Sequence, residues 1–165
     1  MHTRVLALRH GPTLLVRPLQ HGDTGTVSAV FERLGEASRR ARFNGPKPCL
    51  SQEELEQLAV VDRSHHALVA YIDGDAEPVA VARLARTDRA SAEIAFAVAD
   101  EYQHRGIGSA LAAELLCDAR AAGITEVTAL ASSDNPAALA LLRRTTDVQD
   151  VHFEGPELSI RACIA

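Results

Sequence analysis

One strand–loop–helix stretch, residues 91–116, constrains the fold of this chain more than any other feature. It reads SAEIAFAVADEYQHRGIGSALAAELL. Alternating side chains over 91–99 predict a strand with one apolar face. After two glycines, apolar residues recur four positions apart, which predicts an amphipathic helix anchored by Ile107, Leu111, Leu115 and Ala119. We expect this helix to stop at Gly123 and a strand to follow over 125–132, which makes a strand–helix–strand crossover.

The remaining segments add a hairpin, a meander and further helices around that crossover. Strands are predicted at 13–19, 66–72, 77–85, 147–154 and 157–164. Helices are predicted after a cap at Asp23, as a short segment ending at Phe43, after Ser51 with Glu54 as its capping-box partner, and over 135–144. The predicted element order is β-α-α-β-β-β-α-β-α-β-β, a mixed α/β sheet. At this length we expect a single domain over residues 1–165.

Composition limits the classes of function. The chain has 165 residues, with 17 basic and 22 acidic side chains and a net charge of −5. This balance argues against nucleic acid or an anionic membrane as a partner, because phosphate binding favours a basic surface. No apolar run approaches the ~18 residues of a membrane span. The run VLAL near the N-terminus is too short for a signal peptide, so we expect a cytoplasmic protein.

Cysteine and histidine show no metal-binding pattern. The cysteines are three in number and far apart, which fits neither a disulfide framework nor a zinc site. His65 and His66 are adjacent, and neighbours on a helix or strand point in different directions. We therefore expect reduced thiols and no bound metal.

The glycines before the predicted helix indicate an anion site. A helix N-terminus leaves backbone N–H groups unpaired and carries a partial positive charge, and glycine allows an anion to approach closely. Gly-x-Gly alone is weak, since a glycine at a helix start also relieves crowding. Two specific phosphate motifs do not fit. No lysine follows Gly108, as a P-loop requires, and Leu111 occupies the third glycine position of a dinucleotide fingerprint.

The spacing Gln103-x-x-Gly106-x-Gly108, between a strand and a long helix, resembles the acyl-CoA pyrophosphate loop of the GNAT superfamily of N-acetyltransferases. The predicted element order agrees with that family, and SDNPAALALL is similar to its second cofactor segment. Residues 38–62, SRRARFNGPKPCLSQEELEQLAVVD, resemble the bacterial protein-lysine acetyltransferase branch. The best-known members of that branch carry a separate cyclic-nucleotide domain, for which 165 residues leave no room.

The resemblance implies acetyl-CoA as cosubstrate and assigns its contacts. It implies that the diphosphate lies on the backbone from His104 to Ala110, that the pantetheine pairs with backbone at 96–98, and that Asn135 contacts the cofactor from the other side. The implied cofactor residues are Phe96, Ala97, Val98, Gln103, His104, Arg105, Gly106, Ile107, Gly108, Ser109, Ala110 and Asn135.

Glu93 is the candidate catalytic residue. A lysine amine, with a pKa of ~10.4, is almost fully protonated at neutral pH and needs a base. Glu93 lies mid-strand beside the expected thioester, and the protein-acetyltransferase branch has a base in such a motif. Partial desolvation among alanines would help this carboxylate to accept a proton. The alternative is a structural glutamate in a cross-strand salt bridge to Arg83 or Arg86.

The groups expected to stabilise the oxyanion and the leaving thiolate are less evident. We expect a backbone N–H near Val98 to stabilise the oxyanion. Many family members have a tyrosine in the helix after the asparagine, where it protonates the thiolate. Here that region reads AALALLRRTTD, and neither Tyr71 nor Tyr102 matches the position. A thiol of pKa ~8.5 is a tolerable leaving group unaided, so activity does not require that tyrosine.

The sequence leaves open which amine accepts the acetyl group. An acidic region contains Glu53, Glu54, Glu56 and Asp62. It would attract a cationic amine or a lysine-rich surface, or it is a solvated helix face without a specific role. The arginines 39, 40 and 42 would steer the cofactor 3′-phosphate or have no specific role. Three functions remain: a protein-lysine acetyltransferase, a small-molecule amine acetyltransferase, and a non-catalytic acyl-CoA-binding module. The last two strands would also allow a homodimer through a sheet edge.

Overall fold

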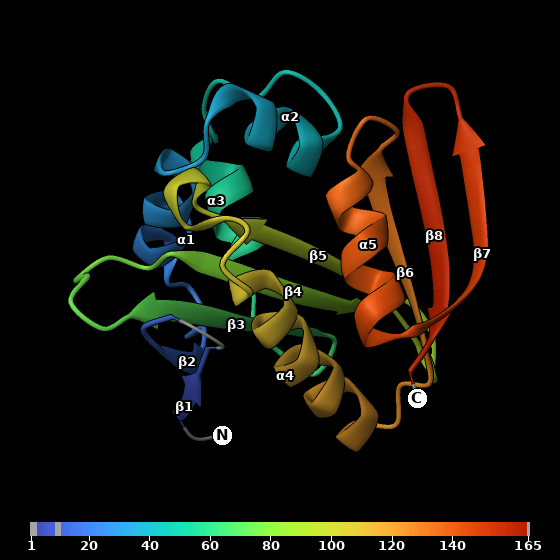
Figure 1. Ribbon diagram of the computed structural model, residues 1–165, viewed down its shortest axis with the longest axis horizontal. Helices are drawn as coiled ribbons and strands as arrows, with labels where there is room; N and C mark the ends of the chain where they lie inside the picture. The colour runs from blue at the N-terminus through green and yellow to red at the C-terminus, as the bar shows by residue number, and fades with distance from the viewer. Residues whose placement is uncertain (1–2, 9–10, 165) are drawn as a thin grey trace.

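The computed structural model describes residues 3–8 and 11–164. Their strands form one eight-stranded sheet in the order β1-β2-β3-β4-β5-β6-β8-β7 (Figure 1). Neighbouring strands are antiparallel except β5 and β6, which are parallel. The strands are β1 (Arg4–Ala7), β2 (Thr13–Pro18), β3 (His65–Ile72), β4 (Ala80–Arg86), β5 (Ser91–Val98), β6 (Glu126–Ser132), β7 (Asp147–Glu154) and β8 (Glu157–Cys163).

The helices agree with the sequence prediction in type and in approximate position. They are α1 (Thr24–Glu32), α2 (Glu36–Phe43), α3 (Gln52–Leu58), α4 (Ile107–Ala121) and α5 (Pro136–Thr145), with a 3-10 turn η1 (Asp100–Tyr102) after β5. The mixed α/β fold is therefore confirmed. The predicted order was incomplete, because it omitted β1 and gave two helices, rather than three, between β2 and β3.

Local side-chain chemistry explains where several helices begin. The Asp23 carboxylate accepts a hydrogen bond from the backbone N–H of Thr26 at 3.0 Å, at the start of α1. Ser51 and Glu54 form the predicted reciprocal capping box at α3, with bonds of 3.2 and 2.8 Å. These caps satisfy N–H groups that no helical carbonyl can reach.

The sheet is covered on both faces. On one face, α4 packs its predicted apolar stripe against the sheet, and Ile107, Leu111, Leu115 and Ala119 are all buried. On the other face, a smaller cluster joins the sheet to the α1 and α3 region through Leu19, Val27, Ala59, Ala67 and Val69. Figure 1 shows α4 lying across β3 and β4, and α5 lying along β6. Four consecutive residues of β3, Ala67–Ala70, are buried, so β3 is covered on both faces, whereas β4 alternates buried and partly exposed residues.

The parallel pair β5 and β6 stays together for only a short distance. The pairing extends from Ser91 opposite Glu126 to Glu93 opposite Thr128. Beyond that point β6 continues along β8, while β5 stays paired with β4 as far as Val98. Figure 1 shows the two strands running in clearly different directions. The second half of β5 therefore has no strand partner on the β6 side, which opens the sheet at its centre.

Candidate active site

A groove of about 570 Å³ lies where β5 and β6 diverge. Its walls come from five segments: α2, the second half of β5, the loop into α4, the end of β6, and α5. Small side chains, such as Ala95 and Ala97 on β5 and Ala137 and Ala138 on α5, keep it open. A strand edge with unused backbone groups along one wall suits an extended ligand that hydrogen-bonds to main chain.

The loop at one end of the groove has an unusual backbone. Gly106 is the N-cap of α4 and has φ of +85°, and His104 has φ of +60°. This left-handed region is disfavoured for residues with a Cβ, so glycine suits position 106. The first turn of α4 then offers its unpaired N–H groups, at Ile107, Gly108 and Ser109, next to the groove. That arrangement is an anion site of the kind found at helix N-termini.

The groove gathers most of the predicted cofactor residues. Those in its lining are Phe96, Ala97, Val98, Gln103, His104, Gly106, Gly108, Ser109 and Asn135. Three others lie outside the lining. Ile107 is buried in the core, and the exposed Arg105 guanidinium lies 5.2 Å from the centroid of the Tyr102 ring. The backbone N–H of Ala110 donates to the carbonyl of Gly106 at 3.0 Å, so unlike our expectation it is not available to a phosphate.

Two of the lining side chains also have structural roles. The Gln103 amide donates to the carbonyl of Val98 at 3.1 Å and to the Ser38 hydroxyl at 2.9 Å, which ties the loop to β5 and α2. The Asn135 amide oxygen accepts the N–H of Ala138 at 3.3 Å and caps α5. Within the part of the chain that the structure describes, no hydrogen bond engages its amide nitrogen, and Asn135 lines the groove.

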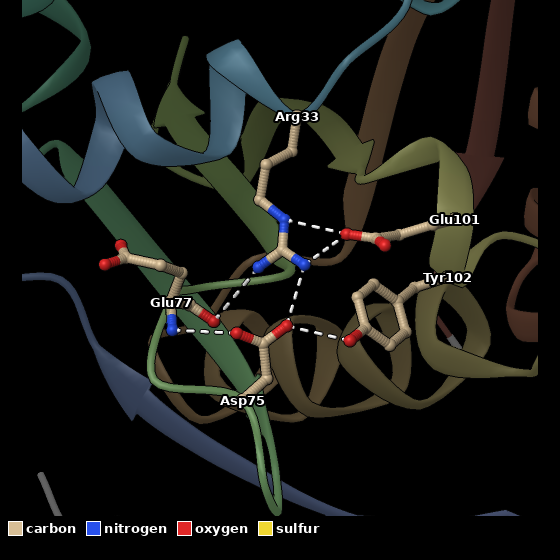
Figure 2. Close-up of polar contacts among 5 residues, drawn as sticks. All are labelled: Arg33, Asp75, Glu77, Glu101 and Tyr102. Carbon is tan, nitrogen blue, oxygen red and sulfur yellow. Dashed lines mark hydrogen bonds and ion pairs between the residues drawn. The ribbon is translucent and has the colours of Figure 1, made fainter.

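A network around Asp75 holds the loop from the other side (Figure 2). The Asp75 carboxylate accepts hydrogen bonds from Arg33 at 2.7 Å, from the Tyr102 hydroxyl at 2.8 Å, and from the backbone N–H of Glu77 at 3.0 Å. Arg33, at the end of α1, also pairs with Glu101. The network joins α1, the β3–β4 hairpin and the loop before α4, and the sequence pattern contains no signal for it.

The same network engages the Tyr102 hydroxyl, in agreement with our expectation that Tyr102 is not the general acid. The hydrogen bond from Arg33 holds the pKa of Asp75 well below its usual range. The resulting carboxylate accepts the proton of Tyr102 in a hydrogen bond, which raises the pKa of Tyr102. A phenol committed in this way is a poor donor to another group, in agreement with the mismatch in its sequence position.

Glu93 lies on β5 at the last residue pair before the strands separate, and it is exposed. The partial desolvation that we expected for its carboxylate is not seen. The predicted alternative, a salt bridge, is not formed within the described ranges. The guanidinium of Arg86 instead donates to the carbonyls of Arg89 and Ala122 at 2.6 and 2.9 Å. Arg83 donates to the carbonyl of Gln57 at 3.4 Å.

The three arginines of α2, at positions 39, 40 and 42, have different surroundings. Arg39 stacks 4.2 Å from the centroid of the Phe31 ring, Arg40 pairs with Glu36 along α2, and Arg42 lines the groove.

Part of the predicted acidic region is neutralised by local contacts. Glu54 pairs with Lys47, and Asp62 binds the backbone and ring of His65. Glu53 and Glu56 line a separate surface hollow of about 470 Å³. Only these two acidic side chains are therefore left to attract a cation.

The model of the acetyltransferase (GNAT) family matches residues 31–146. The chain belongs to this family. Acetyltransferase PA5475 of Pseudomonas aeruginosa is 31% identical over 137 residues, covering 81% of this chain and 74% of the relative. Acetyltransferase Pat of Mycolicibacterium smegmatis is 33% identical over 141 residues, covering 83% of this chain but 42% of Pat. The chain thus spans less than half the length of Pat.

A solved structure agrees with this membership. The GNAT domain of S. lividans PAT superposes with a TM-score of 0.87 at 26% identity, covering 98% of this chain and 97% of that domain. The predictions of family, fold and enzyme class are therefore confirmed: this is a GNAT acetyltransferase, and acetyl-CoA is the cosubstrate of its family.

Two further observations concern membrane-spanning helices and metal-binding side chains. None of the helices in the described part of the chain has the length and apolar character of a membrane span. Across residues 3–8 and 11–164, no three metal-ligating side chains come together.

Proposed function

We propose that this GNAT acetyltransferase moves the acetyl group of acetyl-CoA to the side-chain amine of a protein lysine, with Glu93 as the general base. The observation that carries the proposal is the separation of β5 from β6 directly after Glu93, beside the exposed N-terminus of α4. The groove runs from the phosphate-binding loop along β5 as far as Ile94 and Ala95, and Glu93 lies next to this end, outside the lining.

In the proposed complex, the diphosphate binds the first-turn N–H groups of α4 and the backbone of His104 and Gly106. The pantetheine lies along the unpaired half of β5, and the Asn135 amide contacts it from α5. The carbonyl of Val98 already accepts from Gln103, so we expect the N–H groups of this segment to serve the cofactor and the oxyanion.

The chemical step is a direct attack. The lysine nitrogen forms a bond to the acetyl carbon, the carbon–sulfur bond breaks, and the electron pair leaves with the CoA sulfur. The proton lost by the amine passes to the Glu93 carboxylate, directly or through water. The α5 segment offers no tyrosine to protonate the thiolate. We propose that the thiolate leaves unaided and takes its proton from water.

The protein-lysine acceptor follows from the branch that residues 38–62 resemble. The relative named Pat and the S. lividans PAT domain support that branch. A small-molecule amine is the second candidate, because members of one fold take many acceptors. A cytoplasmic location, a single domain and a homodimer through the β7 edge of the sheet stay predictions.

The test compares wild type with Glu93→Gln, measuring free thiol release from acetyl-CoA with lysine-bearing protein, polyamines and aminoglycosides. Loss of a general base lowers kcat by about 10²-fold or more, and we expect unchanged acetyl-CoA binding. Glu154→Gln is the matched control, because Glu154 is exposed at the end of β7 and does not line the groove. Full activity of Glu93→Gln would refute the base assignment. Binding of acetyl-CoA without turnover of any acceptor would favour a non-catalytic module.

A further inference from the structure

Two arginines lie on the same side of the sheet as Glu93. Arg83 of β4 is opposite Ala95 of β5, and two positions along Ala85 is opposite Glu93. Paired residues, and residues two apart on a strand, share a face. Arg42 of α2 lines the groove above this face, and its charge interacts with the charges of both Arg83 and Glu93. Three elements therefore bring two cations close to the proposed base.

Neither guanidinium has a carboxylate bonded to it within the described ranges. Nη2 of Arg83 donates to the carbonyl of Gln57 at 3.4 Å, while its Nη1 is buried and lacks a hydrogen-bond partner. The Arg42 guanidinium lies 5.0 Å from the centroid of the Phe43 ring and forms no ion pair. Two neighbouring, partly buried cations with unused donors are unfavourable unless an anion joins them.

The electrostatics of the pair agree with this geometry. Burial lowers the pKa of Arg42 to about 10, and the nearby charge of Arg83 acts in the same direction. Burial also lowers the pKa of Arg83. A pKa of about 10 leaves Arg42 fully charged at neutral pH, and a guanidinium in a protein stays protonated. Glu93 supplies one negative charge for two cations.

The cofactor diphosphate is the alternative anion for the two arginines, and the acetyl-CoA affinity of the arginine variants tests it below. Arg42 lies one helical turn after Ser38, which accepts a hydrogen bond from Gln103 of the phosphate-binding loop. Val98 lies five positions after Glu93 on β5, and the phosphate-binding loop begins after that. At about 3.3 Å per residue this is roughly 17 Å of extended strand. The strand neighbour of Arg83, Ala95, lies two positions after Glu93 and three before Val98, so Arg83 is nearer to the proposed base than to that loop. We assign Arg83, and Arg42 above it in the groove, to the acceptor.

We propose that the acceptor carries a carboxylate next to its reacting amine, and that Arg42 and Arg83 bind this carboxylate. In a protein target this is an aspartate or glutamate adjacent to the acetylated lysine. The inference rests on the proposed function, because it names the acceptor of the same site. A carboxylate between the two guanidiniums satisfies their donors and directs the neighbouring amine to Glu93. The same cations favour the neutral form of the amine, which is the form that attacks.

The test uses peptides that differ only beside one lysine, with flanking aspartate, asparagine or lysine. Free thiol release gives kcat/KM for each peptide. A charge-assisted hydrogen bond corresponds to a preference of at least about 10-fold for aspartate over asparagine. L-lysine and cadaverine form a second matched pair, because cadaverine is lysine without its α-carboxylate. This pair separates a free amino acid from a protein as the source of the carboxylate.

Arg42→Met and Arg83→Met keep the length of the side chain and remove its charge. We expect each variant to reduce the preference for aspartate to about 3-fold or less by raising the acceptor KM, with acetyl-CoA affinity unchanged. Arg83→Glu should prefer the lysine-flanked peptide. Arg63→Met is the matched control, because Arg63 is exposed before β3. Thermal melting checks that each variant folds.

A binding measurement separates this inference from the proposed function. Fluorescence anisotropy follows the Nε-acetylated peptides as they bind the protein in the presence of CoA, and it needs no turnover. Selective, arginine-dependent binding without turnover would overturn the proposed function and keep the carboxylate site. Equal binding and equal rates for aspartate and asparagine peptides would overturn the site. Preference for L-lysine over cadaverine with no peptide preference would replace the protein lysine by a free amino acid.

Discussion

Gly106 and Gly108 lie two positions apart, yet substitution by alanine should change the stability of the protein in opposite directions. Gly106 has φ of +85° and no atom lies within 4 Å of a Cβ added there, so backbone strain alone decides the outcome. The left-handed conformation costs a residue with a Cβ about 1–2 kcal/mol. Part of this is offset because alanine loses less entropy on folding. We expect Gly106→Ala to lose about 1 kcal/mol.

Gly108 is instead a helical residue in the first turn of α4. Its added Cβ would lie 3.7 Å from Cγ2 of Val98, an ordinary van der Waals contact. Alanine is favoured over glycine in a helix by up to about 1 kcal/mol. We expect Gly108→Ala to gain about 0.5–1 kcal/mol. At about 2–4 °C per kcal/mol for a chain of this length, the two variants should melt about 3–8 °C apart.

Thermal and urea unfolding without acetyl-CoA measures this difference, and acetyl-CoA KM is measured in parallel. Both methyl groups would enter the proposed phosphate site, so KM should rise for both variants. Gly108→Ala would then be more stable than wild type and bind the cofactor less tightly. A Gly106→Ala protein that melts at or above the wild-type temperature would refute the strain argument. Equal losses in both variants would refute the helical assignment of Gly108.

Two further perturbations test the framework around the groove. Asp75→Asn removes the charge that pairs with Arg33 and should raise acetyl-CoA KM by loosening the loop. The folded-state pKa of Asp75 is depressed, so its contribution to stability is present above the unfolded pKa of ~3.9 and is lost as the pH falls further. The free energy of unfolding should therefore fall less steeply with acid for Asp75→Asn than for wild type. Identical acid titrations of the two proteins would contradict this. Leu111→Ala deletes a fully buried α4 side chain and should cost about 2–5 kcal/mol in urea unfolding, whereas a cost below about 1 kcal/mol would contradict its place in the core.

Features that depend on a few neighbouring residues were predictable. The caps at Asp23 and Ser51 each need only a side chain and an N–H three residues later. The apolar stripe of α4 is visible as a four-residue spacing, and Gly106 precedes it at the position where the left-handed backbone occurs. These features are local, so the sequence pattern contains their cause.

Features that depend on distant partners were missed. β1 has four residues, and its pairing with β2, from Arg4 opposite Val16 to Ala7 opposite Thr13, stabilises it more than any pattern of its own. The Asp75 network joins residues 42 and 27 positions apart in sequence, and charged residues at such separations carry no mutual signal. The predicted partners of Glu93 failed for the same reason, because the side chains of Arg83 and Arg86 bind carbonyls instead.

The sequence by itself determined most of the elements, the family and the loop before α4, because each depends on residues close together in the chain. The tertiary structure decided where the groove opens, since β6 pairs along β8 and leaves half of β5 free. It also decided that α2 brings Arg42 to the groove, and that the Gln103 side chain supports the loop. These contacts join residues far apart in the chain, so they depend on the tertiary fold and not on the local spacing of residues in the sequence.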